Sequence, residues 1–269
     1  MMKVTFIGGG AMGEAMVSGV LAAKLTTPDS VVVSDVSKAR RDVLGRAYRV
    51  KTAADNRAAA RGAEVVVLAV KPQNLKEVLA ELRGVLQPEQ LVLSIVAGAR
   101  LGDLAQGLEH NSLVRAMPNM PAQVRKGVTV WTATGETGEE QRGLARDILS
   151  ALGVEIFVAE EKYVDMATAV SGSGPAYVFL IIEALTDAAV HIGFPRNLAE
   201  QLVVETVMGS TCALQRMKKH PAELKNMVTS PGGTTAEALL ELEKGGLRAL
   251  LTHAVVSAYE KAAKLGAER

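Results

Sequence analysis

The chain is short of cysteine, aromatic residues and net charge. Its single cysteine, Cys212, excludes a disulfide within the chain and indicates a reducing compartment, so we expect a cytoplasmic protein. Aromatic residues make up 3% of the 269 residues, which leaves few rings on which nucleic-acid bases could stack. The formal net charge is +1, so no strong field attracts the chain to DNA or to an anionic membrane. We therefore expect no nucleic-acid partner and no membrane partner.

Long hydrophobic runs and metal-binding patterns are also missing. No run of about 18 apolar residues is free of both charge and glycine, which argues against a membrane span. The four histidines are not spaced as metal ligands and no cysteine pair accompanies them, so we predict no metal site. A reaction whose cofactor supplies the reactive group fits these residues better than catalysis by histidine or cysteine.

The first half of the chain has the pattern of a dinucleotide-binding fold. The β-rich run 4–7 leads into residues 8–13, Gly-Gly-Gly-Ala-Met-Gly, which contain the spacing G-x-G-x-x-G, and a helical pattern follows. A second β-rich run, 31–34, ends at Asp35, 22 residues after Gly13. In this arrangement glycines permit a tight turn and close approach to a pyrophosphate, while the helix N-terminus attracts the phosphates. The pattern predicts a dinucleotide site.

Strand and helix patterns continue to alternate after this motif. We expect strands at 64–70, 91–96, 113–117, 128–131 and 154–158, and a helix at 74–86. Such alternation predicts a parallel sheet with helices on both faces, in which ligands bind at the carboxyl ends of the strands. The predicted fold class is therefore an α/β Rossmann dinucleotide-binding domain over residues 1–158.

The second half of the chain predicts an all-α domain over residues 159–269. Apolar residues recur at helical spacing over 163–191, 198–217 and 248–265. Several of these helices are apolar on more than one face, and such helices are normally buried. Because a domain of this size has little interior, we expect a partner subunit to cover the excess, and hence an obligate homo-oligomer.

Two polar segments interrupt the helical half, at 171–177 and 229–235. The second one directly precedes a helical pattern, and Ser, Gly and Thr at a helix start offer hydroxyls and N–H groups that suit a small carboxylate. The residues alone leave another interpretation equally open, in which Thr234 or Thr235 caps the helix and Glu237 completes a loose capping box.

Six motifs give the whole chain a resemblance to the pyrroline-5-carboxylate reductases, the last enzymes of proline biosynthesis. They are Phe6–Gly13, Ala69–Gln73, Met117–Pro121, Ser171–Tyr177, His220–Lys225 and Thr229–Thr235, of which the last two together are the most specific. The resemblance implies NAD(P)H-dependent reduction of 1-pyrroline-5-carboxylate to L-proline. It also implies a Rossmann domain followed by a helical dimerisation domain, with dimers that often assemble into decamers.

The resemblance further implies which residues form the site. The substrate carboxylate is expected at the dimer interface on Ser230, Gly232, Gly233, Thr234 and Thr235, with Thr235 as the catalytic residue near the imine nitrogen. The expected cofactor-binding residues are Ile7, Gly8, Gly9, Gly10, Ala11, Met12, Gly13, Ser34, Asp35, Asn56, Ala69, Val70, Lys71, Pro72, Ile95, Val96 and Ala97.

The identity of the cofactor depends on Asp35, where many family members carry a small or amide residue. A carboxylate there accepts hydrogen bonds from the ribose hydroxyls of NAD(H) and repels the 2′-phosphate of NADP(H). Three cations lie just downstream, Lys38, Arg40 and Arg41. If they surround the 2′-phosphate, NADPH can also bind; the equally open alternative is that they form a solvated first turn of the next helix. We expect NADP(H) or NAD(H) as cofactor, with NADH accepted well.

Two other functions remain open at this stage. A β-hydroxyacid-type dehydrogenase or a related imine reductase would share the fold, but the dehydrogenase should carry Lys-x-x-Asn on its first interdomain helix, where this chain has Ser-Gly-Ser-Gly-Pro at 171–175. A non-catalytic sensor would bind the nicotinamide cofactor without turning it over.

Overall fold

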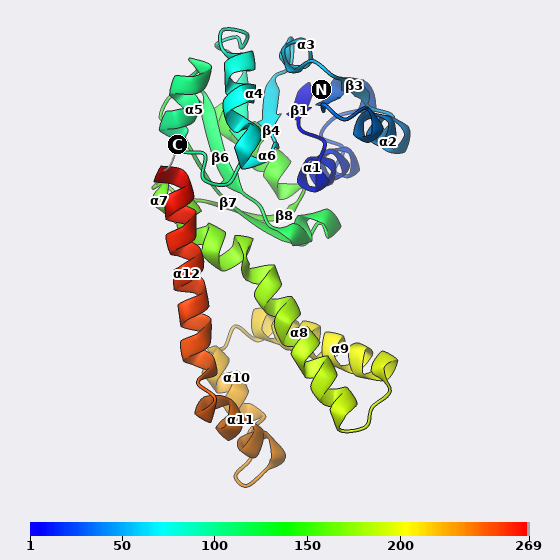
Figure 1. Cartoon of the computed structure of the whole chain (residues 1–269), viewed down its shortest axis with the longest axis vertical. Coiled ribbons are helices and arrows are strands. Elements are labelled where there is room, and N and C mark those ends of the chain that lie inside the picture. The colour runs from blue at the N-terminus through cyan, green and yellow to red at the C-terminus, as the bar shows by residue number, and fades with distance from the viewer. Residues whose placement is uncertain (268–269) are drawn as a thin grey trace. The chain divides into compact units, whose positions relative to one another are not determined.

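The computed structural model describes residues 1–267, which divide into two compact units (Figure 1). The first unit comprises Met1–Ser173 together with the chain from Ala258 onward, and the helical unit comprises Gly174–Ser257. The boundary between these two units, at 173/174, lies later in the chain than the domain boundary at 158/159 expected from the sequence. The expected domain boundary stays a prediction.

The first unit is built on one eight-stranded sheet with the order β3-β2-β1-β4-β5-β6-β7-β8. The strands are β1 (Val4–Ile7), β2 (Val31–Ser34), β3 (Lys51–Ala53), β4 (Val65–Leu68), β5 (Leu91–Ser94), β6 (Leu113–Met117), β7 (Gly127–Ala133) and β8 (Gly153–Phe157). Strands β1 to β6 are parallel and follow the Rossmann order 3-2-1-4-5-6. The predicted fold class is confirmed.

The prediction that the whole sheet is parallel is wrong at its far edge. Strand β7 runs antiparallel to β6, and β8 is parallel to β7. A parallel crossover needs a dozen or more residues, usually including a helix. Between β6 and β7 the chain forms only the short 3₁₀ turn Met120–Val124, so it reverses direction.

Helices cover both faces of the sheet and enclose two hydrophobic cores. Helices α1 (Ala11–Ala22), α2 (Lys38–Tyr48) and α6 (Glu139–Ser150) pack on one face, and α3 (Asn56–Ala60), α4 (Leu75–Leu82) and α5 (Leu101–Leu108) pack on the other. Successive residues of β1 alternate between the cores, with Phe6 in the first and Ile7 in the second. Burial on both faces explains why β4 and β5 lack polar alternation.

The remaining helices are α7 (Lys162–Ala167), a π-helical turn (Thr168–Gly172), α8 (Gly174–His191), α9 (Arg196–Met217), α10 (Pro221–Met227), α11 (Thr234–Lys244) and α12 (Leu247–Ala267). They start in the first unit with α7 and the π turn, continue through the helical unit from α8, and end with α12, whose last residues belong to the first unit again. Within Gly174–Ser257, only Thr186, Ala199 and Val203 are buried, although α8 and α9 pack together. Large apolar side chains such as Leu180 (64% exposed) and Leu250 (63%) remain accessible. A unit with so little core needs further burial to offset its conformational entropy.

Among the described residues, the continuous helical segment Lys162–His191 is long and apolar enough to cross a membrane. Its best window has a mean hydropathy of 1.3, and 6% of that window is buried. Length and composition are weak evidence for a span, because helices buried between subunits have the same character.

Candidate active site

The glycine-rich loop follows β1 at the carboxyl edge of the sheet and starts α1. Gly8 has a φ of +105°, and a Cβ on it would lie 2.6 Å from the Ala69 carbonyl oxygen. A Cβ on Gly13 would lie 2.2 Å from the Gly8 carbonyl oxygen, so only glycine permits this packing of helix on loop. Gly10 is the N-cap of α1, has no side-chain cap and borders open space. The loop thus presents free helix N–H groups where a pyrophosphate can approach.

Asp35 follows β2 and joins the loop to the neighbouring strand. Its Oδ2 accepts a hydrogen bond from the Gly9 N–H at 2.8 Å, and its Oδ1 accepts one from the Ser37 N–H at 2.8 Å. The carboxylate is therefore held in the glycine loop by two backbone donors, at the position where Rossmann folds recognise ribose hydroxyls.

The three cations after Asp35 are engaged in other contacts. Lys38 pairs with Asp42 at 2.8 Å, and Arg40 pairs with Glu14 at 2.7 Å while also donating to the Gly9 carbonyl. Arg41 donates to the backbone carbonyls of Asp35 and Val36 at 2.6 and 3.1 Å. Of these cations, Arg40 braces the glycine loop, whereas Lys38 and Arg41 have their partners within α2 and in the turn that precedes it.

A tyrosine completes this brace. The Tyr48 hydroxyl donates to the Glu14 carboxylate at 3.1 Å. Partial burial and the neighbouring Glu14 carboxylate raise the pKa of Tyr48, so it stays a neutral donor.

A cleft brings together many of the residues expected to bind the cofactor. Its lining includes Ile7, Gly8, Gly10, Ser34, Asp35, Asn56, Ala69, Val70 and Lys71. The other expected residues do not line it: Gly9, Ala11, Met12 and Gly13 belong to the loop and α1, Pro72 follows Lys71, and Ile95, Val96 and Ala97 follow β5. These residues outside the lining nevertheless follow the carboxyl ends of β1, β4 and β5. The cleft, the open space beside Gly10 and the free N–H groups of α1 together fit a dinucleotide.

The structure adds acidic residues that the sequence analysis missed. Glu77 and Glu81 of α4 line the same cleft, and the Asn56 amide Nδ2 donates to Glu81 at 2.6 Å. The Ser34 hydroxyl in turn donates to Asn56 Oδ1 at 2.7 Å. The i, i+4 spacing of the two glutamates was the available signal, because it places them on one face of a helix.

The second predicted site is the loop Thr229–Thr235 between α10 and α11. The alternative interpretation, in which Thr234 or Thr235 caps α11, is wrong: Gly233 is the N-cap, and no side chain caps the helix. Both threonines lie inside the first turn, where backbone N–H groups have no acceptor within the helix. A Cβ on Gly233 would lie 2.5 Å from Ser230 Oγ and 3.2 Å from the Ser230 carbonyl oxygen, so a larger residue there would require the Ser230 side chain to move. The loop offers hydroxyl and N–H donors together.

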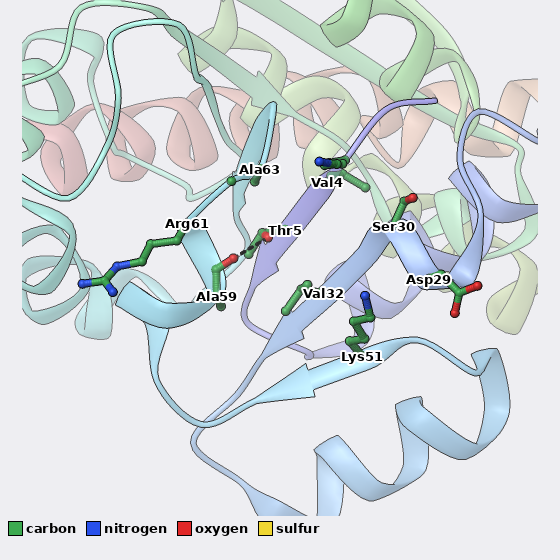
Figure 2. Close-up of a pocket in the computed structure, with 11 residues that line it drawn as sticks. Val4, Thr5, Asp29, Ser30, Val32, Lys51, Ala59, Arg61 and Ala63 are labelled. Carbon is green, nitrogen blue, oxygen red and sulfur yellow. Dashed lines mark hydrogen bonds between the residues drawn. The ribbon is translucent and has the colours of Figure 1, made fainter.

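Another pocket lies at the opposite, amino ends of the strands (Figure 2). Its lining includes Lys3, Asp29, Lys51 and Arg61, and its buried Thr5 hydroxyl donates to the Ala59 carbonyl at 2.7 Å. Ligands of parallel sheets bind at the other edge, so we assign this pocket no role.

Comparison with known proteins accounts for both halves of the chain. The family model described as NADP oxidoreductase, coenzyme F420-dependent, matches residues 3–98, and the model described as pyrroline-5-carboxylate reductase dimerisation matches residues 161–265. A pyrroline-5-carboxylate reductase of Synechocystis is 42% identical over 264 residues, covering 98% of each chain. The chain belongs to the pyrroline-5-carboxylate reductase family.

Solved structures of this family share the fold over almost the whole chain. A pyrroline-5-carboxylate reductase from Coxiella burnetii is 39% identical with a TM-score of 0.90, and one from Plasmodium falciparum with NADP bound is 32% identical with a TM-score of 0.91. Each covers 98% of this chain and of its own. A prephenate dehydrogenase from Aquifex aeolicus, at 14% identity and a TM-score of 0.56, shows likeness of fold alone.

Membership in this family explains the exposed apolar helices. The dimerisation model spans the helical unit and the whole of the segment long enough to cross a membrane. This match supports self-association, and the sequence-based expectation of an oligomer is confirmed to that extent.

Proposed function

We propose that this chain reduces the ring C=N bond of 1-pyrroline-5-carboxylate to give L-proline, with a nicotinamide dinucleotide as reductant. The observation that carries the proposal is that relatives named for this reaction match the chain over both units at 36–42% identity. A cleft lined by expected cofactor-binding residues and a loop that offers N–H and hydroxyl donors support the proposal.

The substrate carboxylate is proposed to bind at the loop Thr229–Thr235 in the dimer. The first-turn N–H groups of Thr234 and Thr235 carry the partial positive charge of the α11 N-terminus, which favours an anion. Ser230 lies beside them on the tight turn that Gly232 and Gly233 allow.

The chemistry needs orientation more than acid–base catalysis. When bound, the dinucleotide supplies the hydride that adds to C5 of the pyrroline ring, and the ring nitrogen gains a proton. The half-buried Thr235 is proposed to place its hydroxyl at that nitrogen and to hold or donate the proton there. Correct placement of the reacting atoms alone contributes roughly 7–11 kcal/mol in well-oriented reactions.

We further propose that NADH is accepted well. The cleft lining carries the carboxylates Asp35, Glu77 and Glu81 against one cation, Lys71, and a 2′-phosphate would add negative charge to that set. The nearby Arg40 and Arg41 already have backbone or carboxylate partners. NADP bound to the Plasmodium relative is a property of that protein, and direct comparison of the two cofactors decides the preference here.

The proposed working form is a cytoplasmic homodimer or a multiple of it, including a decamer, with a dinucleotide-binding domain over 1–158 and a helical domain over 159–269. A single cysteine suits a reducing compartment, and the dimerisation model supports the pairing of two helical domains.

A spectrophotometric assay of NADH oxidation with 1-pyrroline-5-carboxylate tests the reaction, with proline identified as product by amino-acid analysis. Oxidation of a β-hydroxy acid with NAD⁺ but no reduction of the imine would indicate the dehydrogenase alternative. NADH binding without turnover of either substrate would indicate a sensor.

A further inference from the structure

The segment that leads out of the first unit contains an uncommon helical turn. Helix α7 passes into the π-helical turn Thr168–Gly172, in which the Ser173 N–H donates to the Thr168 carbonyl at 2.8 Å, five residues back. Helix α8, the first element of the helical unit, starts directly afterwards at Gly174. One additional residue rotates a following helix by about 100° relative to an uninterrupted α-helix. The π turn therefore lies directly before the first helix of the helical unit.

Asn119 holds this turn from the sheet side. It lies two residues beyond the end of β6, and its Nδ2 donates to the Ser171 carbonyl at 3.0 Å. Its Oδ1 accepts from the Val128 N–H of β7 at 2.9 Å. One side chain thus joins a carbonyl of the π turn to the backbone of β7, and such turns occur frequently at functional sites.

Arg115 anchors the start of the same helical segment. Its side chain is 3% exposed and pairs with Glu161 at 2.7 Å and with Asp165 at 2.5 Å. Glu161 also accepts from the Leu101 N–H at the start of α5, at 2.8 Å. Arg115 lies in β6 and Asn119 lies two residues after its end. This part of the chain therefore contacts α7 through Arg115 and the π turn through Asn119.

We propose that Asn119 is a positioning residue for hydride transfer, which keeps the π turn in place through the Ser171 carbonyl. This inference rests on the proposed function, because the cofactor cleft belongs to the first unit and the Thr229–Thr235 loop belongs to the helical unit. The π turn is part of the covalent connection between these two units. A misplacement of about 1 Å in the reacting atoms can lower a rate by about 100-fold.

Asn119→Asp separates the two hydrogen bonds of this side chain. The carboxylate still accepts from the Val128 N–H, but it cannot donate to the Ser171 carbonyl and repels it. Asn111→Asp is the matched control, because it makes the same chemical change at an exposed asparagine before β6. The readouts are kcat, the KM for the imino acid, the NADH Kd by fluorescence, and amide hydrogen exchange over 168–173.

For Asn119→Asp we expect about tenfold lower kcat, equivalent to about 1.4 kcal/mol, faster exchange of the Ser173 amide, and an unchanged NADH Kd. The primary deuterium isotope effect on kcat should rise, because the chemical step becomes slower. Should this variant melt below the assay temperature, Asn119→Ser, which adds no charge but cannot reach both partners, should show the same pattern.

Equal kcat and equal exchange in Asn119→Asp and Asn111→Asp would overturn the inference. A parallel loss of NADH affinity would overturn it as well, since Asn119 would then act at the cofactor. A wild type that does not reduce the imine would instead refute the proposed function, whereas an active wild type with an indifferent Asn119→Asp would refute only the role of Asn119.

Discussion

Replacing Asp35 by serine should shift the cofactor preference from NADH toward NADPH. The carboxylate follows β2 and is fixed by the N–H groups of Gly9 and Ser37, both at 2.8 Å, so it cannot easily turn away from a phosphate on the ribose. One pair of like charges about 4 Å apart costs on the order of 4 kcal/mol at an effective dielectric of about 20. The two N–H donors and solvent offset part of this cost. We expect a shift in selectivity of at least about tenfold, or about 1.4 kcal/mol.

The measurement is kcat/KM with NADH and with NADPH, expressed as a ratio for each variant. Asp35→Ser also loses hydrogen bonds to the loop, which should cost about 1–3 kcal/mol of stability, but looser binding common to both cofactors cancels in the ratio. Asp29→Ser is the matched control: it removes the same charge from an exposed position just before β2, at the opposite end of the strand (Figure 2).

Two results would refute this reasoning. A wild type that uses only NADPH, together with an indifferent Asp35→Ser, would mean that the basic residues of α2 govern the site. An equal shift in Asp29→Ser would mean that overall charge, and not the position of the carboxylate, decides the preference.

Three further predictions concern the substrate loop, the glycine loop and the assembly. Thr235→Ala should lower kcat/KM, with a loss of about 1–3 kcal/mol in transition-state stabilisation, and should leave the affinity for NADH unchanged. Thr206→Ala on α9 is the control and should change neither quantity. An unaltered kcat/KM in Thr235→Ala would contradict the role assigned to Thr235. Gly13→Ala should weaken cofactor binding and stability by about 1–3 kcal/mol, because its Cβ would lie 2.2 Å from the Gly8 carbonyl oxygen. Gly143→Ala is the control, because no atom lies within 4 Å of the added Cβ. Equal melting temperatures and equal NADH affinities in the two variants would contradict the packing argument. The full chain should sediment as a dimer or a multiple of one, and a stable, active monomer would contradict the argument from the exposed apolar helices.

The sequence by itself determined the local parts of this protein. The spacing of Gly8, Gly10 and Gly13 between a β-rich run and a helical pattern predicted the loop, because strand, glycine turn and helix follow one another directly in the chain. Continuous apolar runs predicted the central strands, since a strand buried on both faces has no polar side. The all-round apolar helices predicted a partner, and the motif residues indicated the family.

Tertiary structure decided what depends on residues far apart in the chain. The direction of β7 was set by a connection too short for a crossover, which β-propensity does not reveal. The caps of α11 could not be read from its composition, because Gly233 and the threonines after it compete for the same position. The links from Glu81 to Asn56 and from Asn119 to Ser171 join residues 25 and 52 positions apart. Such pairs carry no local pattern, so only the packing of α4 and of the π turn against the sheet could bring them together.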